Sequence, residues 1–99
     1  MTATLYIIKG ADAYRFGADP VVRLWEPESI SRTWIRRVTV DLPEGFRVAD
    51  NAYDEPCIYR GDQQYELATD KNDDPVIIDH TNNGAYIHMS VLAEGWDET

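Results

Sequence analysis

The chain of 99 residues has one cysteine, few basic residues and no apolar run long enough to span a membrane. Because Cys57 has no second thiol to pair with, an internal disulfide is excluded, and we expect a reducing compartment, the cytoplasm. The first ten residues, MTATLYIIKG, lack a basic segment, and their apolar stretch is too short for a signal peptide.

Positive charge is scarce. Nine Lys and Arg residues oppose 18 Asp and Glu residues, which gives a formal net charge of −9. This balance argues against direct binding to nucleic acid or to an anionic membrane surface, because both need basic residues. Residues 1–49 contain seven basic and six acidic residues, whereas residues 50–99 contain two basic and twelve acidic residues. Such an asymmetry concerns the choice of partner rather than the fold.

Motifs that bind cofactors or perform catalysis are also missing. The sequence contains no P-loop, GxGxxG, CxxC pair, HExxH or GxSxG. Asp70, Asn72 and Asp74 resemble the start of a calcium loop, since they place oxygen ligands at alternate positions. However, Pro75 occupies the position of the sharp-turn glycine and Thr81 that of the bidentate glutamate, so we interpret the segment as an acidic turn. We expect no cofactor, no metal and no catalytic residue.

The pattern that is present indicates β-structure. Turn signals recur at short intervals, and most apolar runs between them alternate with period two. A hydrophobic fraction of 43% predicts one globular domain over residues 1–99, and we find no internal repeat. We expect a mainly β fold, a small antiparallel sheet built from hairpins with at most one or two short helices. An α+β fold is the alternative.

Several short elements are predicted in the first half of the chain. Residues 4–9 are rich in β-branched and aromatic residues and predict a strand. Residues 20–26 favour a strand, but Asp19-Pro20 could instead begin a short helix. Residues 43–45 predict a turn, and residues 46–48 predict a short strand that leads into an acidic loop.

Residues 32–42 alternate clearly and predict a longer strand. Its predicted core face is Trp34, Arg36, Val38, Val40 and Leu42, and its predicted polar face is Thr33, Ile35, Arg37, Thr39 and Asp41. Arg36 is the exception on the core face, and we expect its stem to lie along the rim with the guanidinium in water. At the other end of the chain, residues 93–99 predict a polar terminus with Trp96 folded back.

Residues 57–68 predict a hairpin with a type II′ turn at Gly61-Asp62, because glycine suits the first central position of that turn. The predicted pairs are Arg60 with Gln63, Tyr59 with Gln64, and Ile58 with Tyr65. Cys57, at the start of this hairpin, has acidic neighbours and is interpreted as an unreactive thiol.

A second hairpin is predicted over residues 76–91, with a type I′ turn at Asn83-Gly84. The predicted pairs are Asn82 with Ala85, Thr81 with Tyr86, His80 with Ile87, Asp79 with His88, Ile78 with Met89, and Val76 with Val91. This register separates an apolar face from a polar face, which supports it. It also makes Asp79 and His88 cross-strand neighbours, for which we expect a surface ion pair. His80 would point to the opposite face, so the two histidines could not share a metal.

The acidic half of the chain is the remaining functional signal. Carboxylates on one side of a rigid sheet can imitate the phosphates of a duplex and occupy the basic groove of a nucleic-acid-binding enzyme. We therefore predict a non-enzymatic domain that binds a protein with a basic surface, an inhibitor of the kind by which phages and mobile elements evade host defence. The predicted partner-binding carboxylates are Asp54, Glu55, Asp62, Glu66, Asp70, Asp73, Asp74 and Asp79. The aromatic residues expected to lie exposed beside them are Tyr53, Tyr59, Tyr65 and Tyr86.

Three alternatives stay open. Acidic charge can serve solubility alone. The protein could be an assembly module that forms homo-oligomers through a sheet edge, which an exposed, apolar and self-complementary edge strand would favour. It could also be a small enzyme that uses Asp79 and His88, which would require those side chains to converge with a third group in a cleft.

Overall fold

A computed structural model describes residues 1–9, 21–24 and 34–97 of the chain. Most of these residues form antiparallel strands, and the one helical segment among them is a short 3₁₀ helix, η1 (His80–Asn82). The strands are β1 (Thr2–Lys9), β2 (Val21–Arg23), β3 (Trp34–Asp41), β4 (Phe46–Asp50), β5 (Pro56–Arg60), β6 (Gln63–Thr69), β7 (Pro75–Asp79), β8 (Ala85–His88) and β9 (Ser90–Asp97). The predicted mainly β fold is confirmed.

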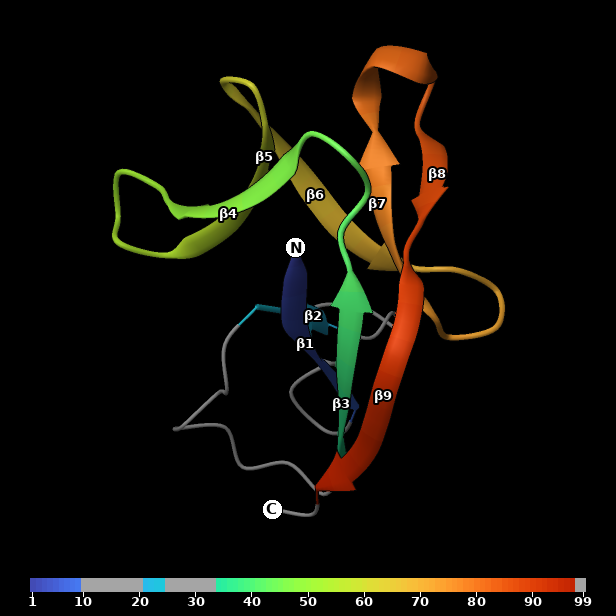
Figure 1. Cartoon of the computed structure of the whole chain (residues 1–99). Helices are drawn as coiled ribbons and strands as arrows, with labels where there is room; N and C mark the ends of the chain where they lie inside the picture. The colour runs from blue at the N-terminus through green and yellow to red at the C-terminus, as the bar shows by residue number, and fades with distance from the viewer. Residues whose placement is uncertain (10–20, 25–33, 98–99) are drawn as a thin grey trace.

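The strands form two sheets, one in the lower half and one in the upper half of Figure 1. The lower sheet has the order β2-β1-β3-β9, and the upper sheet has the order β4-β5-β6-β7-β8. The chain therefore leaves the lower sheet after β3, builds the upper sheet as a meander, and returns with β9 beside β3. Among the described strands, β9 is therefore an edge of the lower sheet and β8 is an edge of the upper sheet.

The hydrophobic core lies between the sheets. The lower sheet and the segment that follows β3 contribute Leu5, Ile7, Val38, Val40 and Leu42, and the upper sheet contributes Phe46, Ile58, Tyr65 and Ile77. Met89 is buried where the chain crosses from β8 to β9, so its side chain anchors the crossover in the core. Each buried aliphatic side chain of this kind contributes about 1.5–3 kcal/mol.

Val38 and Val40 of β3 and Leu42 just after it are buried, as predicted for the core face, whereas the predictions for the Ile35 side chain and for the Arg36 guanidinium are wrong. Ile35, predicted on the polar face, is buried and lies opposite the buried Ile8 of β1. Arg36 has only 12% of its side chain exposed. The expectation that its guanidinium lies in water is therefore wrong, because acidic groups distant in the sequence cover it.

The other predictions for the first half agree with the structure where it describes the chain. Residues 4–9 lie within β1, and Val21–Arg23 form a strand rather than a helix. The predicted turn at 43–45 is present, since the N–H of Phe46 donates to the carbonyl of Pro43 at 3.1 Å. The predicted strands at 20–26 and 32–42 are described only in part. Residues 20, 25–26 and 32–33 lie outside the described residues.

Two loops of the upper sheet have the same conformation, which was not predicted. The loops after β4 and β6 read NAYDEP at 51–56 and DKNDDP at 70–75. In each loop the side-chain oxygen of the first residue accepts hydrogen bonds from the N–H groups two and four residues later. The fourth residue of each, Asp54 or Asp73, has a φ of 60° or 63°. These are matching three-residue hairpin loops, in which a left-handed residue follows a β-turn. The two loops share this conformation although only two of their six residues are identical, so the similarity is one of loop geometry and not an internal sequence repeat.

The hairpin β5–β6 has the predicted register. Arg60 pairs with Gln63, Tyr59 with Gln64, and Ile58 with Tyr65. Gly61 has a φ of 62°, as the first central residue of a type II′ turn requires.

The predicted register of the second hairpin is wrong by three residues. The observed pairs are Val76 with His88, Ile77 with Ile87, Ile78 with Tyr86, and Asp79 with Ala85. The Asp79 carboxylate accepts hydrogen bonds from the backbone N–H and the hydroxyl of Thr81, at 3.0 and 2.6 Å. These bonds stabilise η1, so the connection between the strands spans residues 80–84 instead of two residues. A slip by an odd number exchanges the faces, which removes the predicted pairing of Asp79 with His88.

The predicted polar terminus is also wrong. Strand β9 pairs with β3 from Asp41↔Ser90 to Ile35↔Asp97, with a bulge at Leu92 between the pairs of Val91 and Ala93. The partner strand is far away in the sequence, so the local composition of the tail did not indicate it.

Candidate functional site

Arg36 is enclosed by acidic residues, of which Asp73 and Asp74 were predicted to bind a partner and Glu94 was not. Its guanidinium donates to Glu94, to Asp74 at 3.1 Å, and to the backbone carbonyl of Asp73 at 2.7 Å. Burial alone would lower the pKa of Arg36, but the hydrogen bonds to Glu94 and Asp74 outweigh it and hold that pKa above its ordinary value. The side chain of Asp73 forms an ion pair with Lys9 at 2.7 Å. Basic residues of the first half thus neutralise three of the acids.

Both histidines also lie beside carboxylates. His80 Nε2 lies 3.6 Å from a carboxylate oxygen of Glu66, and His88 Nδ1 lies 3.8 Å from one of Asp70. The pKa of Asp70 is lowered chiefly by the backbone N–H groups that donate to it within its own loop, with a smaller contribution from His88. His88 is therefore placed beside Asp70 and not beside Asp79.

Asp79 and His88 do not form the centre that the enzyme alternative requires. Val76 occupies the position opposite His88, three residues and about 10 Å along β7 from Asp79. The Asp79 carboxylate is engaged by Thr81, whose hydroxyl is the main cause of its lowered pKa. Residues 70–74 form the predicted acidic turn, and the described part of the chain contains no group of three or more side chains that could hold a metal ion.

Five acidic side chains have no cation beside them within the described residues: Glu44, Asp50, Asp54, Glu55 and Asp62. Three of them flank Tyr53, which is 82% exposed at the β4–β5 loop. We call Asp50, Tyr53, Asp54 and Glu55 the acidic hairpin tip. Asp62 lies in the β5–β6 turn, at the opposite end of β5.

The acidic residues do not gather on one side of a sheet. In Figure 1 the β4–β5 loop lies at the left, the β5–β6 and β7–β8 turns lie at the top, and the β6–β7 loop lies at the right. Together with the ion pairs around Arg36 and Lys9, this arrangement contradicts the expected single acidic face.

The tyrosines expected to be exposed differ in their environments. Tyr65 is buried, and its hydroxyl accepts a hydrogen bond from Arg60 at 2.7 Å, so the expectation that it is exposed is wrong. Its cross-strand partner Ile58 is also buried, and cross-strand partners share a face. Tyr59 is half-buried under the guanidinium of Arg47. Tyr86 is half exposed on β8.

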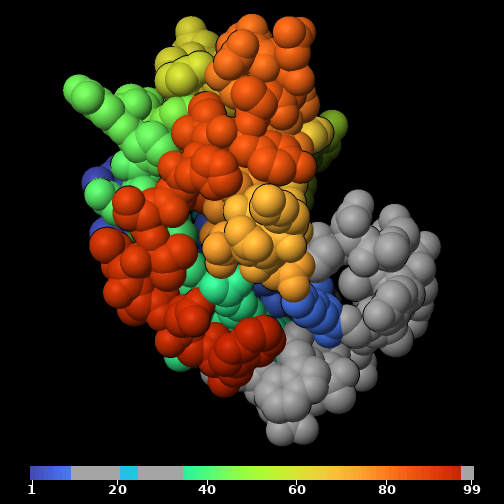
Figure 2. All heavy atoms as spheres, turned by 90° about the vertical axis from the view of Figure 1, so that its right-hand side faces the viewer, coloured from blue at the N-terminus to red at the C-terminus, as the bar shows by residue number. Residues whose placement is uncertain are grey.

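Strands β8 and β9 carry most of the large apolar side chains that the described residues expose. Tyr86, Val91, Leu92 and Trp96 are between 43% and 57% exposed. In Figure 2 this part of the chain, in orange and red, runs over the face shown, from its upper to its lower end. Residues 85–97, which we call the C-terminal edge, contain no Lys, Arg or Pro, the residues that commonly protect sheet edges from pairing. The bulge at Leu92 is the protective feature that is present.

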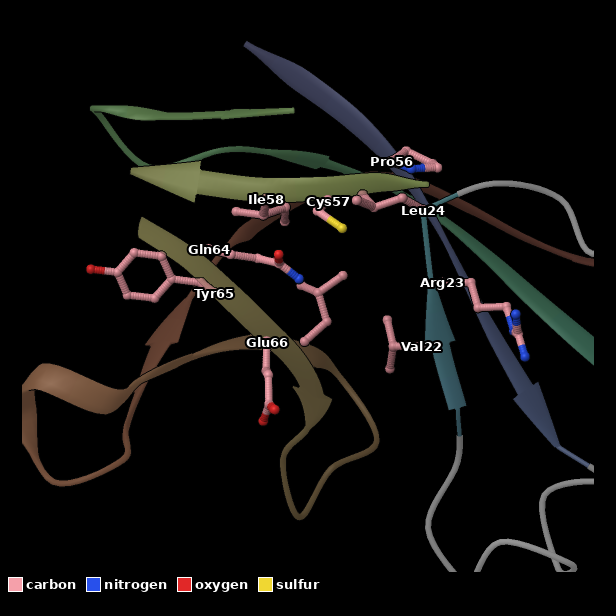
Figure 3. Close-up of a pocket in the computed structure, with 10 residues that line it drawn as sticks. Val22, Arg23, Leu24, Pro56, Cys57, Ile58, Gln64, Tyr65 and Glu66 are labelled. Atoms are coloured by element: carbon pink, nitrogen blue, oxygen red, sulfur yellow. The ribbon is translucent and has the colours of Figure 1, made fainter. Parts of the chain in front are cut away.

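A pocket of about 220 Å³ lies where β2 approaches β5 and β6 (Figure 3). Val22 of β2 and Leu24, which follows β2, line it on one side, and Ile58 and Leu67 line it from the upper sheet. Cys57 also lines the pocket. Burial and the charge of Glu55 raise the pKa of its thiol, which agrees with the interpretation of this cysteine as unreactive.

Comparison with known protein families, with curated proteins and with solved structures finds no match for this chain. None of the helical structure in the described residues is long and apolar enough to cross a membrane.

Proposed function

We propose that this protein is a non-enzymatic assembly module in which two copies associate through the C-terminal edge. The observation that carries the proposal is the concentration of exposed apolar side chains on two consecutive edge strands that lack Lys, Arg and Pro. Such an edge offers unpaired main-chain groups together with apolar surface, and pairing with another strand satisfies both.

The sequence of β9 is compatible with pairing to itself. A two-fold axis through Glu94 of an antiparallel pair places Leu92 of each copy opposite Trp96 of the other, so exposed apolar side chains would face each other twice. The two Glu94 carboxylates would meet near the axis, and like charges there are unfavourable. Each of them is neutralised by Arg36 of its own chain, which reduces this repulsion.

Sedimentation velocity over a range of protein concentrations tests the proposal. The wild-type chain should form a dimer, and Leu92→Lys should shift it to monomer, because a lysine on an edge strand opposes pairing. Tyr53→Lys is the matched control, since it places the same charge on another exposed side chain outside the edge, and it should still dimerise. A wild-type chain that stays monomeric at its solubility limit, or a Leu92→Lys variant that dimerises as well as the wild type, contradicts the proposal.

The acidic hairpin tip favours a second candidate function, the binding of a basic protein in place of nucleic acid. Its three carboxylates without a cation partner lie around an exposed tyrosine, a residue type that is enriched among those that contribute most to binding at interfaces. If this function holds, the chain should capture a nucleic-acid-binding protein from the lysate of its host, and added duplex DNA should compete for that protein. The double variant Asp54→Asn, Glu55→Gln should lose the capture, whereas Glu44→Gln should retain it. Capture that is indifferent to DNA contradicts mimicry.

A further inference from the structure

Strands β5 and β6 separate before their ends. Their ladder stops at the pair Ile58↔Tyr65, although β5 begins at Pro56 and β6 continues to Thr69. Hydrogen-bonded pairs alternate along an antiparallel ladder, so the next such pair after Ile58↔Tyr65 would join Pro56 with Leu67. Proline has no N–H to donate, which explains why the ladder ends there. The side of β6 next to Leu67 is therefore not paired with β5.

Strand β2 of the lower sheet lies across this opening and completes a pocket. In Figure 3, Val22 and Leu24 lie on the side of β2 that faces β5 and β6, while the Arg23 side chain extends away. The volume, about 220 Å³, is below the range of roughly 300–1,000 Å³ that is typical of small-molecule and cofactor sites. The pocket is thus of a size for one aliphatic side chain rather than for a cofactor.

The rim of this pocket is negative. Glu66 lines it with a side chain that is 70% exposed. Asp50 and Glu55, at the neighbouring hairpin tip, act electrostatically on Cys57, which also lines the pocket. A positively charged group that enters here would therefore meet Glu66, which has only the exposed His80 beside it, together with the field of Asp50 and Glu55, whereas a negative group would be repelled.

We propose that the opening between β2, β5 and β6 docks an extended segment of a partner protein, with an aliphatic side chain in the pocket and a Lys or Arg beside Glu66. Main-chain groups of the docked segment would pair with the open side of β6 near Leu67, as in other cases of strand addition. This inference goes beyond the proposed dimerisation and does not depend on it, because it uses a surface distinct from the C-terminal edge.

Titration of ¹⁵N-labelled protein with two blocked peptides, monitored by NMR, tests the inference. The probes are acetyl-Lys-Val-Leu-Val-Lys-amide and its acidic counterpart acetyl-Glu-Val-Leu-Val-Glu-amide. The basic peptide should shift the amide signals of residues 22–24, 57–58 and 64–67 in a saturable manner, and it should slow the alkylation of Cys57. The acidic peptide should do neither.

Two variants separate the electrostatic contribution from a general loss of charge. Glu66→Gln should weaken the binding of the basic peptide by roughly two- to fivefold, the effect of one exposed ion pair. Glu44→Gln makes the same chemical change in the β3–β4 turn and should leave binding unchanged.

Three results would overturn the inference: no saturable shift with either peptide, equal binding of both peptides, or equal weakening by the two variants. Shifts confined to residues 85–97 would also overturn it, while they would support the C-terminal edge as the binding surface. Conversely, a wild-type chain that fails to dimerise but binds the basic peptide at the pocket would overturn the assembly proposal alone.

Discussion

At the scale of single residues, Arg36 is the side chain that most clearly links the two sheets through charge. It extends from β3 toward the β6–β7 loop of the upper sheet and toward β9. Its guanidinium donates hydrogen bonds to the carboxylates of Asp74 and Glu94 and to the backbone carbonyl of Asp73. The hydrogen bonds fix the loop against the lower sheet, whereas the two carboxylates remain about half exposed. The contribution to stability is therefore that of charged hydrogen bonds partly screened by water.

We expect Arg36→Ala to lower the free energy of unfolding by about 1–3 kcal/mol, because it leaves Asp74 and Glu94 close together without a cation. Urea unfolding at neutral pH measures this loss. Arg47→Ala is the control, since Arg47 is exposed and donates one hydrogen bond to the carbonyl of Gly61, and its loss should be below about 1 kcal/mol. Equal losses in the two variants would show that the Arg36 cluster adds nothing beyond an ordinary surface contact.

Substitution of Asp54 tests the backbone strain in the β4–β5 loop, because this non-glycine residue adopts a left-handed conformation. Its φ of 60° lies in the left-handed region, where an alanine is disfavoured and a glycine is not. Its exposed side chain lies beside no cation of the described residues. Asp54→Gly should therefore be more stable than Asp54→Ala by about 1 kcal/mol, measured by thermal or urea unfolding. The opposite order would mean that the loop changes its conformation in the variants.

At the scale of elements, the register of a hairpin could be predicted from the sequence where the two turn residues alone determine the length of the connection. Gly61-Asp62 forms the expected two-residue turn, and the register of β5–β6 follows from it. Asn83-Gly84 also adopts left-handed conformations, with φ values of 55° and 73°, yet the register of β7–β8 differs. There the side chain of Asp79 competes, because it binds Thr81 and begins η1 before the turn.

The candidate surfaces were harder to predict than the strands, because they depend on contacts between distant segments. Glu94 lies 58 positions from Arg36, and no local pattern indicates that these two residues meet. The exposure of Leu92 and Trp96 follows from the pairing of β9 with β3, which the polar composition of the tail concealed. Tyr65 is the exception, since its predicted pairing with the apolar Ile58 already placed it on the buried face.

The shared loop conformation also predicts a pH dependence for the hairpin β6–β7. The pKa of Asp70 is lowered in the folded chain, mainly by the backbone N–H groups that it accepts. A lowered pKa contributes stability above the unfolded value of about 3.9, and that contribution is lost as the pH falls through the folded pKa. Asp70→Asn retains an accepting oxygen, as Asn51 does in the first loop, but it does not titrate. When the pH falls from neutral to values below the pKa of a free aspartate, the stability of this variant should therefore decrease less than that of the wild type.

Urea unfolding at several pH values measures this difference. Asp62→Asn is the matched control, because Asp62 accepts no hydrogen bond from the loop backbone within the described residues and has no cation beside it. It should retain the acid sensitivity of the wild type. If Asp70→Asn and the wild type lose stability in parallel, Asp70 is not a source of the acid sensitivity.

At the scale of the whole molecule, the net charge of −9 affects the two candidate functions in opposite ways. The acidic hairpin tip would attract a basic partner, and the attraction between unlike charges weakens as salt screens it. Two copies of this chain repel each other at long range, and the C-terminal edge contains no basic residue that would offset the repulsion. Added salt should therefore strengthen association through that edge.

We expect the dimer dissociation constant of the wild-type chain to fall as sodium chloride rises from low to about 0.5 M, where the Debye length has shrunk to a few ångströms. Sedimentation velocity measures it, and the Leu92→Lys variant should remain monomeric throughout. Capture of a basic partner by the acidic hairpin tip should decline over the same range. A dimer that dissociates as salt rises would instead be held by unlike charges. Its contact would then lie between acidic loops of one copy and exposed basic residues such as Arg47 of the other, and not along β9.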